Sequence, residues 1–226
     1  MFKKVTNILI PLVAVPIVIV LGVTVFESKQ YALISLALSI LVCVPMLLTF
    51  EKQKTDINKL VVLAAMIALC VVGRFVFSFA PGFKPVTAMI VITAIYFGAQ
   101  AGFLTGALTA VISNFYFGQG PWTPFQMFSW GLIGLLAGVL SQPLKQSRLL
   151  QAVFGILSGI LFSLLMDLWT AVWWDDAIIL SRYLALVVAA LPMTLTYAFS
   201  NCVFLVLLTK PIGKKLERIK IKYGIK

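Results

Sequence analysis

The chain contains long runs of apolar residues, and charged residues interrupt them mainly at their ends. A helix that crosses the hydrocarbon core of a bilayer needs about 20 such residues. Eight candidate segments lie at residues 6–26, 31–50, 58–80, 85–98, 100–117, 125–142, 149–174 and 183–209. Hydrophobic residues make up 62% of the 226 residues and charged residues only 11%, whereas soluble domains carry about 25% charged residues. The sequence therefore predicts an all-α, polytopic membrane protein and argues against a soluble enzyme.

Basic residues are distributed unevenly among the loops between these segments. Of the 18 lysines and arginines, 14 fall on one side of the bilayer, namely Lys3, Lys4, Lys52, Lys54, Lys59, Lys145, Arg148, Lys210, Lys214, Lys215, Arg218, Lys220, Lys222 and Lys226. The positive-inside rule assigns this side, and with it both termini, to the cytoplasm of a multi-pass protein of the cell membrane. The basic residues from Lys210 to Lys226 are expected to serve as an ordinary determinant of topology, and contact with anionic lipid or with a cytoplasmic partner is the alternative. The sequence shows no basic module typical of nucleic-acid binding.

The residues that most enzymes use for catalysis are scarce in this chain. Histidine is absent, the three cysteines stand alone in apolar runs, and no phosphate-binding loop of the GxxxxGK[ST] type occurs. We therefore expect no metal site, no cofactor of its own and no ATP hydrolysis by this chain. An intramembrane enzyme based on Asp167 and the Asp175–Asp176 pair remains an alternative, although these carboxylates have no evident catalytic partner.

All five tryptophans fall on the predicted outer half of the protein. They are Trp122, Trp130, Trp169, Trp173 and Trp174. A simple aromatic belt would occupy both membrane interfaces, so this one-sided distribution indicates an aromatic cavity that opens outward. A belt remains the alternative for Trp173 and Trp174, which lie at the end of a predicted span.

The segment between residues 114 and 126 is uncharged and combines amide side chains, aromatic rings, glycines and prolines. Its amides and rings include Asn114, Gln119, Trp122, Phe125 and Gln126. Glycine and proline fix turns, while amides and aromatic faces are typical of ligand pockets. We therefore predict that this segment lines a binding site, with Trp130 directly after it.

Two charged residues lie inside predicted spans. Arg74 belongs to the segment 58–80 and Asp167 to the segment 149–174. A charge at the centre of a span costs roughly 2.5–3.5 kcal/mol on insertion scales, so it usually has a partner or faces a cavity. Arg74 either reaches the outer surface or contacts a ligand. Asp167 is shorter, which favours a cavity or an ion pair.

Small residues recur at helical spacing in three of the spans. The stripes are Gly98, Gly102 and Gly106, then Gly131, Gly134 and Gly138, then Gly155 and Gly159. Such stripes allow two helix backbones to approach closely within a bilayer. We predict helix–helix contacts along them.

These features together resemble the substrate-binding (S) component of energy-coupling factor vitamin transporters. The resemblance covers about residues 55–210 and is carried by residues 52–59, 63–68, 74–85, 98–103, 118–127 and 131–138. The segment from Gly118 to Met127, followed by the glycines of 131–138, is the most specific part. Within that family the chain is most similar to the cobalamin-specific S component.

The resemblance implies a domain organisation and a set of partners. It implies a six-helix core at residues 55–210. The count of apolar segments adds two N-terminal transmembrane helices at residues 1–54, which depart from the six-span pattern of the family, and a basic cytoplasmic tail follows at 211–226. A protein of this family captures a vitamin at the outer face and tilts on a transmembrane coupling (T) subunit, which joins two cytoplasmic ATPases. The family's contact with the T subunit falls here on Ala64 and Ala68.

The resemblance also implies where the vitamin binds. The implied regions are 74–84, 114–126 and 167–182, and their candidate ligand residues are Arg74, Phe79, Lys84, Asn114, Gln119, Trp122, Phe125, Gln126, Trp130, Asp167 and Trp173. Cobalamin is the implied vitamin, and without histidine the protein would hold it by its periphery. An S component for riboflavin or pantothenate and a self-sufficient carrier remain alternatives.

Overall fold

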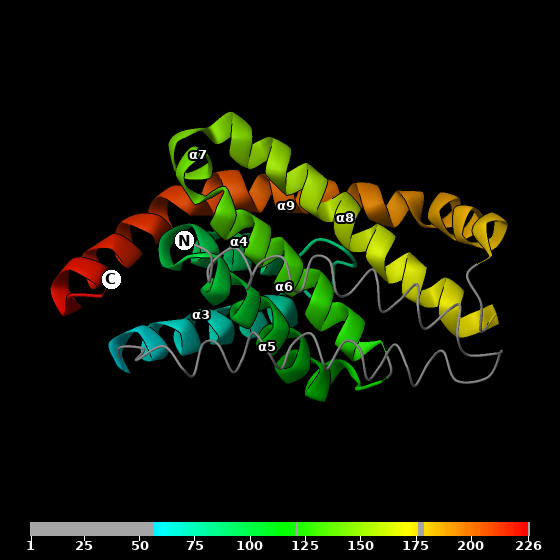
Figure 1. Ribbon diagram of the computed structural model, residues 1–226, viewed down its shortest axis with the longest axis horizontal. Coiled ribbons are helices and arrows are strands. Elements are labelled where there is room, and N and C mark those ends of the chain that lie inside the picture. Colours follow the sequence, from blue (N-terminus) through cyan, green and yellow to red (C-terminus); the bar gives the residue numbers. More distant parts are fainter. Residues whose placement is uncertain (1–56, 121, 176–178, 226) are drawn as a thin grey trace, which may run out of the picture.

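The computed structural model describes residues 57–120, 122–175 and 179–225, and these residues are helical apart from short connections (Figure 1). The helices are α3 (Ile57–Val76), α4 (Val86–Phe97), α5 (Ala99–Phe117), α6 (Thr123–Val139), α7 (Ser141–Gln146), α8 (Arg148–Asp175) and α9 (Leu180–Tyr223). The two predicted N-terminal spans lie outside the described residues. Within the described residues, the predicted all-α architecture is confirmed.

Three of these helices are long and apolar enough to cross a membrane. They are α3, α8 over Arg148–Trp174, and α9, while α4 and α6 are shorter apolar helices. The fourth predicted segment, residues 85–98, is the shortest of the eight, and it forms a helix of 12 residues. It begins after Pro85, which cannot donate a backbone hydrogen bond, and it ends at Gly98, whose φ of 91° favours glycine.

The short helix α4 forms the centre of the bundle. Every residue of α4 except Tyr96 is buried, and the helix contacts α3, α5, α6 and α9. A helix that is apolar on all sides must be enclosed by other helices. The other helices therefore surround α4, and side chains such as Ile90 and Ile92 are fully buried.

The glycine stripes bring two pairs of helices into close contact. Gly102 on α5 and Gly134 on α6 face each other so closely that a Cβ on either would lie under 3.0 Å from the other's backbone. On the second pair, Gly155 and Gly159 of α8 lie against the backbone of α9 at Cys202 and Ala198. The predicted helix–helix contacts are confirmed at these positions, whereas Gly98 ends α4 and would leave an added Cβ without a neighbour within 4 Å.

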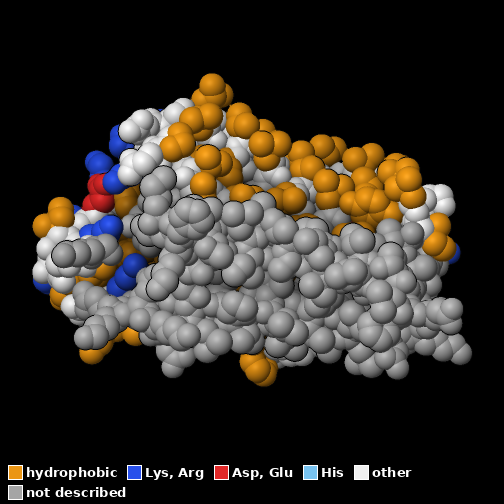
Figure 2. Space-filling model, in the orientation of Figure 1, with side chains coloured by type: hydrophobic (Ala, Val, Ile, Leu, Met, Phe, Trp, Pro, Cys, Tyr) orange, Lys and Arg blue, Asp and Glu red, His pale blue; other side chains and the backbone are white. Residues whose placement is uncertain are grey.

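The two ends of the molecule differ in chemistry. The start of α3, the helix α7 and the end of α9 lie at the same end, while α8 ends and α9 begins at the other (Figure 1). Lysine, arginine and acidic side chains gather at the first end, and hydrophobic side chains cover the visible surface along α8 and α9 (Figure 2). The helix α7 and the helical continuation of α9 from residue 210 to Tyr223 are additions to the spans predicted from sequence.

Candidate functional site

A cluster of polar side chains lies where α3 and α5 end and α6 begins. The connection between α3 and α4 (residues 77–85) and the described residues of the turn between α5 and α6 (residues 118–120 and 122) lie beside it. The cluster contains both charged and amide side chains, although it lies next to the apolar core. Each of its members is therefore expected to be held by hydrogen bonds.

Arg74 points from the last turn of α3 towards α5. Its Nη1 donates hydrogen bonds to the side chain of Ser113 and to Oδ1 of Asn114, the latter at 2.7 Å. Ser113 in turn donates to the carbonyl of Thr109 at 2.6 Å. Arg74 is thus held by neutral acceptors of the protein, which distinguishes it from an arginine that only reaches for the membrane surface.

Asn114 connects three helices through one buried amide. Its Oδ1 accepts from Arg74, and its Nδ2 donates to Thr123 Oγ1 at 3.0 Å and to Gln126 Oε1 at 2.8 Å. The side chain is 1% exposed. An amide offers one acceptor oxygen and two donor hydrogens, so all three functions of Asn114 are used to join α3, α5 and α6.

The turn between α5 and α6 is closed by the same network. Thr123 Oγ1 donates to Gln119 Oε1 at 3.0 Å and accepts from the backbone amide of Gly120 at 3.3 Å. Gln119 also donates from Nε2 to the carbonyl of Val111 at 2.9 Å. The turn is therefore fastened to both helices that it joins.

Aromatic rings enclose the guanidinium of Arg74. Its Cζ lies 4.5 Å from the ring centroid of Phe117 and 5.4 Å from that of Trp130. A cation over an aromatic face is stabilised by the ring quadrupole. Trp130 also stacks on Phe162 at 5.5 Å, and Phe162 meets Tyr197 edge to face at 5.3 Å. The cation is thus joined to a row of rings that reaches α9.

Lys84 approaches the cluster from the connection between α3 and α4. Its backbone amide donates to Ser200 Oγ at 2.8 Å, and Ser200 Oγ donates back to the carbonyl of Lys84 at 3.1 Å. Its Nζ lies 5.6 Å from the ring centroid of Phe117. Burial, and secondly the nearby charge of Arg74, lower the pKa of Lys84 from its ordinary value of 10.5.

A small cavity lies between Lys84, Trp130 and Tyr197. Its volume is about 30 Å³, and its lining also includes Gly82, Val86, Thr87, Phe162 and Asn201. This volume is about the share of one water molecule in the liquid. A ligand larger than a few atoms does not fit in this cavity as it stands.

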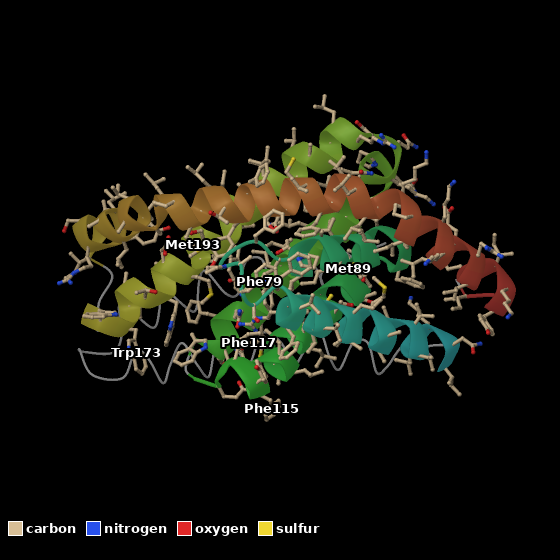
Figure 3. All side chains as sticks on the ribbon, turned by 180° about the vertical axis from the view of Figure 1, so that it is seen from behind. Phe79, Met89, Phe115, Phe117, Trp173 and Met193 are labelled. Carbon is tan, nitrogen blue, oxygen red and sulfur yellow. The ribbon has the colours of Figure 1, made fainter. Side chains whose placement is uncertain are left out.

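Other predicted site residues form a separate group on α6 and α8. Phe125 is buried against Trp169, with ring centroids 4.9 Å apart, and Trp169 lies 5.3 Å from Trp173. Asp167 accepts a hydrogen bond from Ser163 at 3.4 Å. In Figure 3, Trp173 lies near the end of α8, away from Phe117. The predicted residues therefore divide between two neighbourhoods.

Two predicted aromatic residues are more exposed than the polar cluster. Phe79 is 79% exposed and stacks only on Phe77, with ring centroids 6.2 Å apart. Trp122 is 41% exposed, and its six-membered ring lies against Gly120. Both residues belong to the connections beside the cluster.

The predicted set omits several residues that complete the cluster. They are Ser113, Phe117, Thr123, Phe162, Tyr197 and Asn201. Tyr197 and Asn201 are polar residues four positions apart within a predicted span, a spacing that places them on one helix face. This spacing could have predicted that α9 contributes to the site. Phe117 and Thr123 lie within the segment 114–126 that was predicted to line the site, although neither was named among the candidate residues.

Larger hollows lie near the end of the molecule where α3 begins and α9 ends. One of about 700 Å³ lies beside Tyr96, Lys145 and Lys220, and a mostly apolar one of about 710 Å³ lies between α3 and the end of α9. Both lysines of the first hollow have partners, because Lys145 pairs with Glu217 at 2.6 Å and Lys220 donates to the carbonyl of Tyr96. Among the described residues, no three His, Cys, Asp or Glu side chains form a possible metal site.

The fold and the cluster define a helical membrane protein with a polar, aromatic-lined region enclosed near one set of interhelical connections. A family model described as the ECF-type riboflavin transporter, S component matches residues 54–218. The chain belongs to this family of energy-coupling factor S components, which are substrate-binding subunits of transporters. No curated protein and no solved structure matches the chain.

Proposed function

We propose that this chain captures a vitamin at the outer face of the cell membrane for an ATP-driven importer of the energy-coupling factor type. The observation that supports this most is the buried network centred on Asn114, which holds Arg74 close to the rings of Phe117 and Trp130. Fixed donors next to flat aromatic surfaces suit a ligand with a planar or amide-bearing part. The partners in this proposal are a T subunit and two cytoplasmic ATPases.

Binding in this proposal requires a movement of the connections beside the cluster. The cavity of about 30 Å³ is far smaller than any vitamin. The connection 77–85 is held to α9 through the hydrogen bonds between Lys84 and Ser200. Outward displacement of this connection would join the cavity to the space beside Phe117, without a change in the helices themselves.

For the vitamin we propose cobalamin, and riboflavin is the second candidate. Cobalamin is supported by the resemblance of the chain to the cobalamin-specific S component and by the combination of tryptophans and amide side chains, which suits a large ligand with amide-bearing parts. Riboflavin is supported by the description of the family that matches the chain. A chain without histidine offers no imidazole to the cobalt, so cobalamin would be bound through its periphery.

Isothermal titration calorimetry of the purified protein with cobalamin, riboflavin, pantothenate and folate tests this function. We expect one of them to bind without ATP. Gln126→Ala removes an acceptor of Asn114 and should weaken binding by about tenfold, as expected for the loss of one or two hydrogen bonds. Trp130→Phe retains an aromatic ring next to Phe162 and tests whether vitamin affinity depends on the larger indole. A folded protein that binds none of the four vitamins would contradict the proposal.

A further inference from the structure

The two cations of the polar cluster have no carboxylate partner among the described side chains. Arg74 donates only to Ser113 and Asn114, and the Nζ of Lys84 makes no hydrogen bond to a described residue. The described side chains include two carboxylates. Of these, Asp167 accepts from Ser163, and Glu217 pairs with Lys145. Two positive charges thus stand together without compensation from this part of the chain.

Both cations face one aromatic ring. The Cζ of Arg74 lies 4.5 Å and the Nζ of Lys84 lies 5.6 Å from the ring centroid of Phe117. Trp130 is close to both, because its ring centroid lies 5.4 Å from the Cζ of Arg74 and the residue lines the same cavity as Lys84. The two charges therefore converge on one region of the protein, even though they come from different segments.

The structure fixes the backbone of Lys84 and leaves its ammonium group without an acceptor among the described residues. Ser200, which is fully buried, both accepts from the amide and donates to the carbonyl of this residue. The lysine is therefore anchored beside Arg74. Keeping it protonated there costs free energy, because burial and a neighbouring like charge both disfavour its charged form. An anion that bound between the two cations would remove that cost.

We propose that Arg74 and Lys84 form an anion subsite, so that the vitamin captured here carries a phosphodiester, phosphate or carboxylate group beside a part that packs on Phe117 and Trp130. This inference rests on the proposed vitamin-binding function and narrows its ligand. Cobalamin has a phosphodiester and pantothenate has a carboxylate, whereas riboflavin has neither group. The subsite therefore favours the first candidate vitamin over the second.

Pairs of ligands that differ only in an anionic group show how much that group contributes to binding affinity. Flavin mononucleotide and riboflavin share one ring system and differ by a phosphate, while pantothenate and pantothenol differ by a carboxylate. Calorimetry should show that the anionic member of any pair that binds does so about tenfold more tightly or better, which is typical of hydrogen bonds to charged groups. Cobalamin is titrated in parallel.

Lys84→Gln removes the charge without removing a hydrogen bond between described residues, so the variant is expected to fold. In this variant the preference for the anionic member should disappear, and cobalamin should bind about tenfold more weakly. Lys84→Arg should retain most of the wild-type affinity. Lys214→Gln, which removes an exposed charge from the last part of α9, serves as the matched control and should change nothing.

The outcomes distinguish the proposed anion subsite from the proposed vitamin-binding function. Tighter binding of riboflavin than of flavin mononucleotide, or unchanged affinities in Lys84→Gln, would overturn the anion subsite and leave vitamin binding intact. Failure of the folded wild-type protein to bind any member of the panel would overturn both. Loss of the anionic preference in Lys84→Gln with its retention in Lys214→Gln would support both.

Discussion

Asn114 is the residue on which the geometry of the polar cluster depends most. It lies in the last turn of α5 and holds Arg74 of α3 together with Thr123 and Gln126 of α6. Because the amide is 1% exposed, water cannot replace these contacts. Its contribution to stability therefore comes mainly from the partners that would be left without a hydrogen bond.

Asn114→Ala should lower the free energy of unfolding by about 2–4 kcal/mol, because it leaves the partly buried guanidinium of Arg74 and the amide of Gln126 each with one partner fewer. Thermal unfolding in detergent, followed by tryptophan fluorescence, measures the change. Phe115→Ala is the matched control, since the neighbouring side chain is 78% exposed and points away from the bundle (Figure 3). Equal losses in both variants would show that the network contributes nothing specific.

The sequence identified the main polar residues of the cluster, but it did not identify the residues to which they form hydrogen bonds. Arg74, Asn114 and Gln126 stand out because polar side chains are costly inside apolar runs, and the structure joins them through hydrogen bonds. Ser113 and Thr123 are small and common in membrane helices, so their role as partners could not be read from composition. Which residues share a site depends on helix rotation, and an apolar run does not specify that rotation.

The helix pair α5 and α6 depends on residues that have no side chain. Gly102 and Gly134 lie backbone to backbone, and Gly106 lies in the same way against Trp130 and Gly131. This contact aligns the end of α5 with the start of α6, where Asn114 meets Gln126. Close packing by small residues is a main source of helix association in a bilayer.

Gly134→Ala should therefore destabilise the protein by about 1–3 kcal/mol, the usual range for overpacking of a close contact. The added Cβ would lie under 3.0 Å from the backbone of Gly102, and a backbone cannot move aside without separating the helices. Val139→Ile is the control, because it also adds one carbon to α6 but at an exposed position. If both variants unfold at the wild-type temperature, the contact between the two glycines is not tight in solution.

The ends of the helices were harder to predict than their existence. The sequence places the end of the last span at residue 209, because Lys210 and Pro211 read as a stop. The helix α9 nevertheless continues through Pro211 to Tyr223. Its last turns pack on α4, where Gly213 lies against the ring of Tyr96 and Lys220 donates to the carbonyl of Tyr96. These tertiary contacts stabilise a helix that the local sequence does not favour.

On the scale of the whole molecule, binding and coupling would use different parts of one bundle. The polar cluster lies at the end of α3 that contains Arg74, whereas Ala64 and Ala68 lie earlier in the helix, ten and six residues before Arg74, and are exposed on its surface. No hydrogen bond between described residues links these alanines to the cluster. In the proposed transporter, a change at the alanines should therefore leave vitamin capture unaffected.

Ala64→Trp combined with Ala68→Trp tests this separation. Two indoles at i and i+4 project from one helix face and would keep a T subunit from approaching α3 closely. We expect vitamin affinity to remain at the wild-type value, while ATP-coupled uptake in vesicles with the T subunit and ATPases falls to the level without ATP. Leu191→Trp with Leu195→Trp is the matched control, because both leucines are exposed on α9 at the same spacing. If the double alanine variant still takes up the vitamin, the contact with the T subunit lies elsewhere. If this variant no longer binds the vitamin, capture and coupling are not separate.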